Sequence, residues 1–225
     1  MKADNKVATV ALRALPMFAK LGDDSLVNIG KVAALRRVAR HGIVLNAGDS
    51  IDSMYLILSG GLKVVMGDHD GREVILCMLG PGDFFGEMGV IDDHPRSATV
   101  QATDESSLVV IGKDDFQRCM AENTEVALYV MRNLVKRLRL ADRKIQSLSL
   151  LDVYGRVARA LLDMAEERDG RKVVTRRVTR QDIAQMVGAS REMVSRVMRD
   201  LQMRGLIEER DSCIWLCDDI DNVQQ

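Results

Sequence analysis

The chain has 225 residues, of which 47% are hydrophobic and 29% charged, as is typical of a globular protein. No run of 18 or more apolar residues and no signal-peptide pattern occurs, so we exclude membrane-spanning and secreted classes and expect a cytoplasmic protein. The formal net charge is −1, yet residues 171–204 hold nine basic and three acidic side chains, a local charge of +6 that suits a polyanion.

Short strands separated by glycine-rich turns are predicted in the first half of the chain, after a helix at 23–34. Ten of the 17 glycines lie between Gly42 and Gly89. The β-rich runs between and beyond them are 54–58, 62–66, 73–79, 97–100 and 107–111, with a hairpin loop at 67–71. This pattern predicts an α+β protein whose residues 1–113 form an antiparallel β-roll with flanking helices.

Residues 84–100 carry the side chains that an anionic ligand would need. Gly86 brings backbone N–H groups close to a ligand. Glu87 can accept from a sugar hydroxyl, Arg96 offers a fixed cationic fork for a phosphate, and Ser97 adds a hydroxyl donor. Glu87 and Arg96 could instead pair across a turn. If the arginine serves only an anion, replacing Arg96 with leucine removes ligand response and leaves the fold intact.

A single long helix is predicted over 114–151. Its apolar side chains recur at intervals of 3 and 4 residues, which is an a/d heptad seam: Met131, Leu134, Leu138, Ala141, Ile145 and Leu148. An amphipathic helix lying on its own domain is the alternative, but such helices show a wider apolar stripe. The seam therefore favours a coiled coil that joins two copies of the chain.

Residues 152–225 are predicted to form a second, smaller domain. Its first helix, at 154–167, is expected to end at Asp169-Gly170, and a β-hairpin is expected around Asp211-Ser212. Between them Thr179 begins a T-x-x-D helix cap, Gly188 ends that helix, and Ser190 caps another. Two helices joined by so short a turn predict a helix-turn-helix.

The second of these helices has two contrasting faces. The stripe expected to be buried consists of Met193, Val194, Val197, Met198 and Leu201. The exposed stripe consists of Arg191, Glu192, Ser195, Arg196 and Arg199. Arginine can bond guanine bidentately and glutamate can accept from cytosine, so the exposed stripe predicts readout of double-stranded DNA. A surface helix with ordinary salt pairs is the alternative.

The segment F-G-E-M-x₇-R-S-A-T-V resembles the phosphate-binding cassette of cyclic-nucleotide-binding domains. Together with L-D-V-x-G-R at 151–156 and S-R-E-x-V-x-R at 190–196, it resembles the catabolite activator (CRP/FNR) family over residues 18–215. The resemblance implies a β-roll, a dimerisation helix and a winged helix-turn-helix. It also implies ligand contacts from Glu87 to a ribose, from Arg96 and Ser97 to a cyclic phosphate, and from the Gly86 and Met88 amides.

The same resemblance implies a homodimer that binds a pseudo-palindromic DNA site under control of an effector, with RNA polymerase as a further partner and no enzymatic activity. Arg191, Glu192 and Arg196 would read the major groove, and Thr179 and Arg180 would lie near phosphates. The full expected DNA-binding set is Thr179, Arg180, Gln181, Ser190, Arg191, Glu192, Ser195, Arg196 and Arg199.

One position departs from the family pattern. Catabolite activators present a Thr-Ser pair to adenine, whereas this chain has Ala141 and Asp142, followed by Arg143. A carboxylate only accepts hydrogen bonds, and the guanine edge offers two adjacent donors where adenine offers one. We favour cAMP as effector and keep cyclic di-GMP as the alternative, with Asp142 and Arg143 in the expected ligand site.

A haem or redox sensor is the alternative from another class. An iron–sulfur cluster would need cysteines near the N-terminus, and none precedes Cys77. A haem could be imagined on His69 and Cys77. The four cysteines match neither a disulfide framework nor zinc spacing, so no metal and no covalent cofactor is expected.

Overall fold

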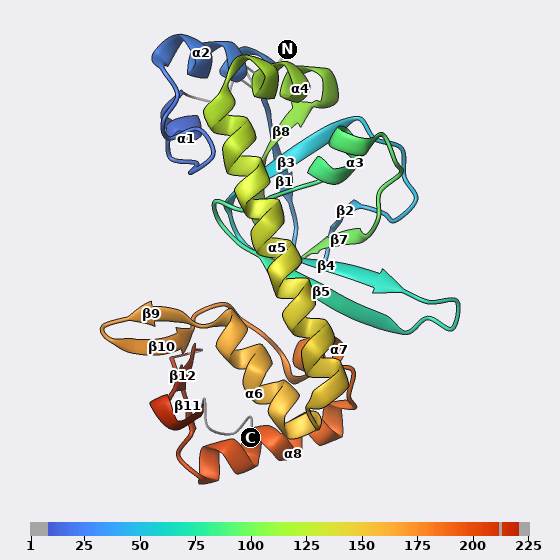
Figure 1. The fold of residues 1–225 in the computed structure, drawn as a ribbon, viewed down its shortest axis with the longest axis vertical. Coiled ribbons are helices and arrows are strands. Elements are labelled where there is room, and N and C mark those ends of the chain that lie inside the picture. The colour runs from blue at the N-terminus through green and yellow to red at the C-terminus, as the bar shows by residue number, and fades with distance from the viewer. Residues whose placement is uncertain (1–8, 212, 221–225) are drawn as a thin grey trace. The chain divides into compact units, whose positions relative to one another are not determined.

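The computed structural model describes residues 9–211 and 213–220, which form two compact units (Figure 1). The first unit runs to Lys136 and the second begins at Arg137, so the division falls within helix α5 (Thr124–Leu150). Each unit has its own hydrophobic core. The three-part division at 113 and 151 stays a prediction.

The first unit consists of two four-stranded sheets and the helices that pack on them. Its elements, before α5, are α1 (Thr9–Arg13), α2 (Asp23–Val32), β1 (Ala34–Val38), β2 (Ile43–Leu45), β3 (Ser53–Ser59), β4 (Leu62–Gly67), β5 (Glu73–Leu79), β6 (Phe84–Phe85), α3 (Glu87–Asp92), β7 (Thr99–Ala102), β8 (Ser106–Gly112) and α4 (Lys113–Glu122). The sheet orders are β1-β8-β3-β6 and β2-β7-β4-β5, and every strand pair is antiparallel. The predicted antiparallel roll is confirmed.

The core of this unit fixes the segment that carries the expected ligand residues. Tyr55 of β3 and Phe85 of β6 stack with ring centroids 5.0 Å apart. Phe84 is buried in the cluster formed with α2, α4 and α5. Consecutive aromatic side chains thus anchor opposite sides of β6, immediately before Gly86 and α3, because successive residues of a strand point to opposite faces.

Two helix predictions are wrong in their bounds. The helix expected at 23–34 ends at Val32, and Ala34 begins β1, whose side chains are mostly exposed and so give no alternating apolar signal. The helix expected over 114–151 is two helices, α4 and α5. Asn123 between them is extended, and both its N–H and its Nδ2 donate to the carbonyl of Cys119.

The second unit packs three helices against a small antiparallel sheet. Its elements, after α5, are α6 (Val153–Met164), β9 (Glu166–Arg168), β10 (Arg171–Val174), α7 (Arg180–Val187), α8 (Arg191–Met203), β11 (Ile207–Arg210) and β12 (Cys213–Leu216). The sheet order is β11-β12-β10-β9. The hairpin expected around Asp211-Ser212 is confirmed as β11–β12, although Ser212 lies outside the described residues.

The helix expected at 154–167 is wrong at its C-terminal end. It stops at Met164, and the next residues form β9. Asp169 and Gly170 do not end a helix but turn the chain between β9 and β10, with φ of 52° and 73°. Two consecutive left-handed residues are the geometry of a tight hairpin turn.

Candidate functional site

Local capping determines where α7 and α8 begin and end. The hydroxyl of Thr179 accepts from the Asp182 amide, and the Asp182 carboxylate accepts from the Thr179 amide, which is a complete capping box. Gly188 ends α7 with φ 64°. Ser190 caps α8 by accepting from the Met193 amide at 3.2 Å. The predicted helix-turn-helix is confirmed, with its caps and turn at the expected residues.

The contact between α7 and α8 holds the second helix in place. Ile183, Ala184 and Val187 of α7 are buried, and so are the α8 residues in the same cluster, Val194, Met198 and Leu201. Val197 is half-buried against that cluster. Met193 was expected in the buried stripe and is 43% exposed, which corrects that prediction.

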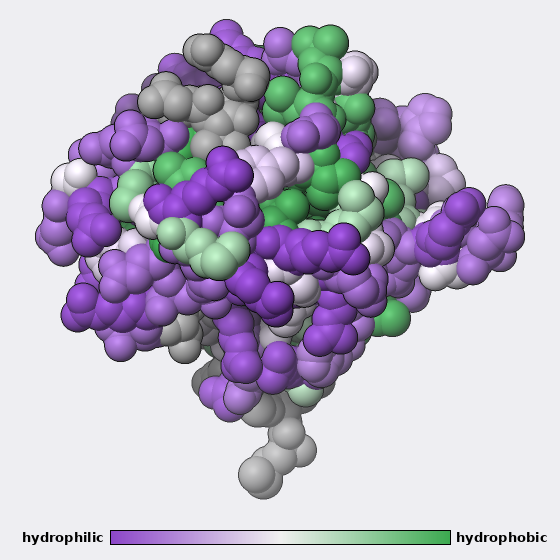
Figure 2. Space-filling view, turned by 90° about the horizontal axis from the view of Figure 1, so that it is seen from below, coloured by the Kyte–Doolittle hydropathy of each residue, from purple (hydrophilic) through white to green (hydrophobic). Residues whose placement is uncertain are grey.

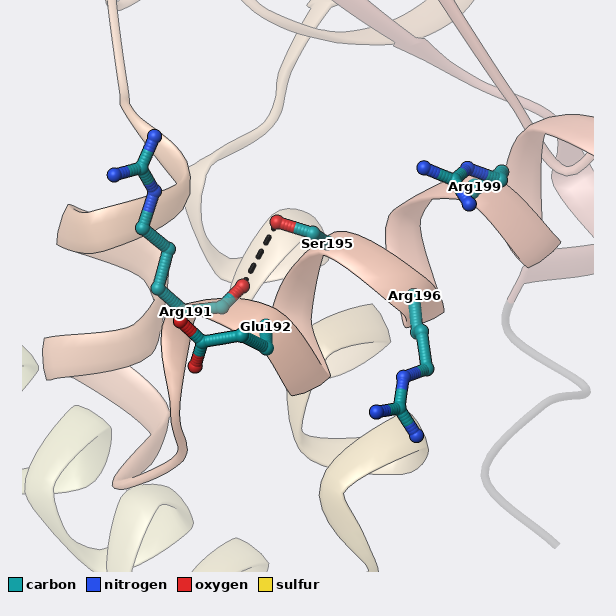
Figure 3. A pocket seen from close by; sticks show the side chains of 5 residues that line it. All are labelled: Arg191, Glu192, Ser195, Arg196 and Arg199. Atoms are coloured by element: carbon teal, nitrogen blue, oxygen red, sulfur yellow. Dashed lines mark hydrogen bonds between the residues drawn. The ribbon is translucent and has the colours of Figure 1, made fainter.

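The opposite face of α8 is open. Arg191, Glu192, Ser195, Arg196 and Arg199 line one shallow hollow of about 280 Å³ (Figure 3). The Ser195 hydroxyl donates to the carbonyl of Arg191 at 2.8 Å, and the Arg191 and Arg196 side chains extend in different directions from the helix. The helix therefore presents several separately aimed hydrogen-bonding groups on one surface.

The Glu192 carboxyl stays ionised to lower pH than an ordinary glutamate. Its own backbone N–H and the Ser190 hydroxyl lower the pKa of the Glu192 carboxyl, and Arg191 and Arg196 lower it further by charge attraction. A carboxyl whose pKa is lowered stays ionised as pH falls toward its ordinary range. It can then accept hydrogen bonds and cannot donate them.

The first turn of α7 carries the residues expected near phosphates. Thr179 uses its hydroxyl in the helix cap, and Gln181 is exposed. The Arg180 guanidinium pairs with the carboxylate of Glu209 on β11. No pattern in the sequence indicated that pair, since its members lie 29 residues apart. Figure 2, which looks onto the α8 side of this unit, shows a largely hydrophilic surface.

The ligand segment of the first unit is built around Gly86. That residue precedes α3 in the left-handed conformation, with φ 81°. A Cβ there would meet Nη1 of Arg96 at 2.8 Å, so the position accepts only glycine without displacement of the arginine. Glu87 is 2% exposed, whereas Met88 is 52% exposed and Ser97 is exposed.

Arg96 has a structural role that the sequence did not reveal. Its Nη1 donates to the carbonyl of Gly86 at 2.7 Å and its Nη2 to that of Ser53 at 2.5 Å, while Asp52 lies 3.4 Å from Nη2. The side chain is 3% exposed. These contacts argue against the expectation that loss of Arg96 leaves the fold intact, because two backbone carbonyls accept from this side chain. Its Nε is buried and has no hydrogen-bond partner within the described part of the chain.

The remaining expected site residues lie on α5. Asp142 and Arg143 are exposed and belong to the second unit, and their part in a ligand site stays a prediction. Within a single chain, four large seam side chains are 48–63% exposed: Met131, Leu138, Ile145 and Leu148. Ala141 is exposed as well, and Leu134 is half-buried against the first core. Among residues 9–211 and 213–220, the seam is thus an apolar row that is exposed along most of its length.

The two residues considered for a haem, His69 and Cys77, lie apart on the β4–β5 hairpin. Cys77 of β5 pairs with Val64 of β4. His69 is five residues after Val64, in the loop that joins β4 to β5. At about 3.4 Å per strand residue the two side chains are roughly 15 Å apart, too far to hold one iron.

Within residues 9–211 and 213–220, no cluster of three or more His, Cys, Asp or Glu side chains could hold a metal. Over the same residues no helix is long and apolar enough to span a bilayer.

Two family models match the chain, a cyclic nucleotide-binding domain at residues 35–123 and a Crp-like helix-turn-helix domain at 155–219. The chain is 36% identical over 182 residues to the cAMP-activated global transcriptional regulator Vfr of Pseudomonas aeruginosa, covering 76% of this chain and 84% of that one. It is 34% identical over 179 residues to a CRP-like cAMP-activated global transcriptional regulator of Mycobacterium tuberculosis, covering 78% and 80%.

Among solved structures, the c-di-GMP responsive global regulator CLP of Xanthomonas campestris matches with a TM-score of 0.70 and 29% identity, covering 87% of this chain and 99% of that one. The match to a cyclic nucleotide-binding domain agrees with the antiparallel roll, and the match to a Crp-like helix-turn-helix domain agrees with the capped helices α7 and α8. The relatives match over both domains in the same order. The chain belongs to the CRP/FNR family of transcription regulators.

Proposed function

We propose that the chain acts as a homodimer that binds a pseudo-palindromic DNA site and responds to a cyclic nucleotide. The observation that carries the DNA-binding part is the open face of α8, where five polar side chains line one surface. The proposed recognition helix enters the major groove with this face, and two-fold symmetry places two such helices about one DNA turn, roughly 34 Å, apart. We expect the dimer to act in the cytoplasm and to meet RNA polymerase there.

Base readout is assigned to three side chains. Arg191 and Arg196 suit guanine, whose O6 and N7 accept both donors of a guanidinium fork, and Glu192 suits the N4 amino group of cytosine. Arg180 and Thr179 lie one helix away, at the start of α7, and are assigned to phosphates. Phosphate contacts position the protein without reading sequence.

Selection from randomised DNA duplexes tests this assignment. Arg196→Ala should relax the selected consensus at one base pair of each half-site, with a cost of about 1–3 kcal/mol per contact. Arg180→Ala serves as the control, because a lost phosphate contact weakens binding to all sequences alike. An unchanged consensus for Arg196→Ala together with an altered one for Arg180→Ala would contradict the assigned orientation of α8.

The ligand part is supported by the unpartnered Nε of Arg96. A guanidinium donor buried without a partner costs free energy, and a phosphate oxygen is its natural acceptor. The left-handed backbone at Gly86 and the start of α3 lie beside the same guanidinium. Arg96, Ser97 and the Gly86 and Met88 amides would hold the phosphate, and Glu87 the ribose.

We favour cAMP as the effector because the relatives Vfr and the Mycobacterium tuberculosis regulator are named as cAMP-activated. Cyclic di-GMP is the second candidate, supported by the similar CLP structure and by the acceptor-only Asp142. Calorimetric titration with cAMP, cGMP and cyclic di-GMP distinguishes them. Asp142→Ser should shift preference from guanine toward adenine, and an unshifted preference would remove Asp142 from the site.

Control of DNA binding would follow from a shift between two dimer arrangements. A ligand can move such an equilibrium only by the difference in its affinity for the two states. DNA and ligand then affect each other's binding by the same factor. Titrating a labelled operator duplex with and without each cyclic nucleotide measures that factor directly.

A further inference from the structure

The β11–β12 hairpin carries an acidic residue where its packing pattern calls for an apolar one. Ile207 pairs with Leu216 across the hairpin, and both side chains are buried. Glu209 pairs with Ile214, whose side chain is also buried. Side chains two apart on a strand and those directly opposite across a pair share one face of the sheet. Glu209 therefore lies on the inner face of the hairpin, in line with Ile207.

Glu209 is turned toward the helix-turn-helix. Its carboxylate pairs with Nη2 of Arg180, the first residue of α7, and the two side chains are 37% and 28% exposed. Glu208 precedes it on the outer face, paired in register with Trp215, over whose ring the Arg171 guanidinium lies at 5.3 Å. The two neighbouring glutamates thus have the same charge but face opposite sides of one hairpin.

We infer that Glu209 is an internal counter-ion of Arg180 that lowers the protein's affinity for DNA of every sequence. The inference rests on the proposed DNA-binding function. A carboxylate and a DNA phosphate compete for the same guanidinium, and the carboxylate also repels the phosphate. Phosphate contacts carry no sequence information, so restraining this one reduces the time the protein spends on unrelated DNA.

The isosteric change Glu209→Gln removes the charge and keeps the volume. We expect it to tighten binding to operator and to unrelated duplex alike, by about 3- to 20-fold for a dimer with two such pairs. The slope of log affinity against log salt concentration should steepen by about one unit for each arginine released. Fluorescence anisotropy with one operator duplex and one scrambled duplex, at several salt concentrations, measures both effects.

Glu208→Gln is the matched control, because it removes an equal charge one residue away on the outer face. The double variant Arg180→Ala/Glu209→Gln should bind as Arg180→Ala does, since the counter-ion has no cation left to neutralise. An equal gain from Glu208→Gln, a gain that persists without Arg180, or weaker binding by Glu209→Gln would each overturn the inference. Fluorescence of Trp215, the only tryptophan, checks that the hairpin is folded in each variant.

The outcomes also distinguish this inference from the proposed function. A wild-type protein that binds no duplex DNA contradicts the proposed function, and the counter-ion role fails with it. A wild-type protein that binds operator DNA, with Glu209→Gln leaving affinity and salt slope unchanged, contradicts the counter-ion role alone.

Discussion

Replacing Arg96 with leucine should destabilise the first unit as well as abolish ligand binding. Arg96 donates to the carbonyls of Gly86 and Ser53, which tie the start of α3 to β3. A hydrogen bond from a charged group contributes about 1.5–3 kcal/mol, so the two bonds together contribute about 3–6 kcal/mol. Removing a buried charge recovers part of this, and we expect a net loss of about 2–4 kcal/mol.

Hydrogen exchange followed by mass spectrometry locates the expected effect. Amides of 53–59 and 84–92 should exchange faster in Arg96→Leu, because local opening of the segment becomes less costly. Amides of α8 should keep their protection, since the second unit has its own core. Arg37→Leu is the control: it removes the same kind of side chain from an exposed position of β1 in the same unit.

A urea titration followed by circular dichroism gives the size of the loss. If Arg96→Leu unfolds at the wild-type urea concentration with wild-type exchange in 53–59, the two carbonyl bonds contribute nothing and the structural role assigned to Arg96 is refuted. If Arg37→Leu shows the same loss, the effect belongs to the arginine-to-leucine change in general and not to the buried site.

Two further variants test separate parts of the structure. Ser190→Ala removes the cap of α8 and should lower the free energy of unfolding by about 1 kcal/mol, read from urea unfolding by Trp215 fluorescence, with Ser149→Ala as a hydroxyl-removing control. Burial raises the pKa of the Cys119 thiol to about 11, so at pH 8 this thiol stays protonated and iodoacetamide should label the half-buried Cys77, Cys213 and Cys217 first. Early labelling of Cys119, located by peptide mapping, would contradict that.

Features set by neighbouring residues were predictable from the sequence. Thr179, Gly188 and Ser190 act through hydrogen bonds or backbone angles within a few residues, so their types alone located both ends of α7 and the start of α8. The same holds for strand β5, whose bounds match the prediction. The error at β9 has the opposite cause: Glu166 and Glu167 favour helix locally, and pairing with β10 overrides that preference.

Features set by distant partners were not predictable. Arg96 bonds a carbonyl 43 residues away, and Arg180 pairs with a glutamate 29 residues away. Side-chain types identified both arginines as anion-binding candidates, yet only the fold shows which of their donors are already engaged. The break at Asn123 was missed for a different reason: both flanking segments are helical, and the hydrogen bonds from Asn123 to the Cys119 carbonyl end α4 without a glycine or proline to mark the place.

The exposed seam of α5 allows a direct test of the proposed dimer. Leu138 is 62% exposed in the single chain, and burying that fraction in a partner contributes about 1–2 kcal/mol per subunit. Leu138→Asp loses this contribution twice and buries two carboxylates, each costing several kcal/mol, so the dimer dissociation constant should rise by more than about a thousandfold. Gln146→Asp adds the same charge at a position outside the seam and should leave the dimer intact. Light scattering at micromolar protein concentration measures the oligomeric state of both variants. An intact Leu138→Asp dimer would show that the two copies associate through another surface.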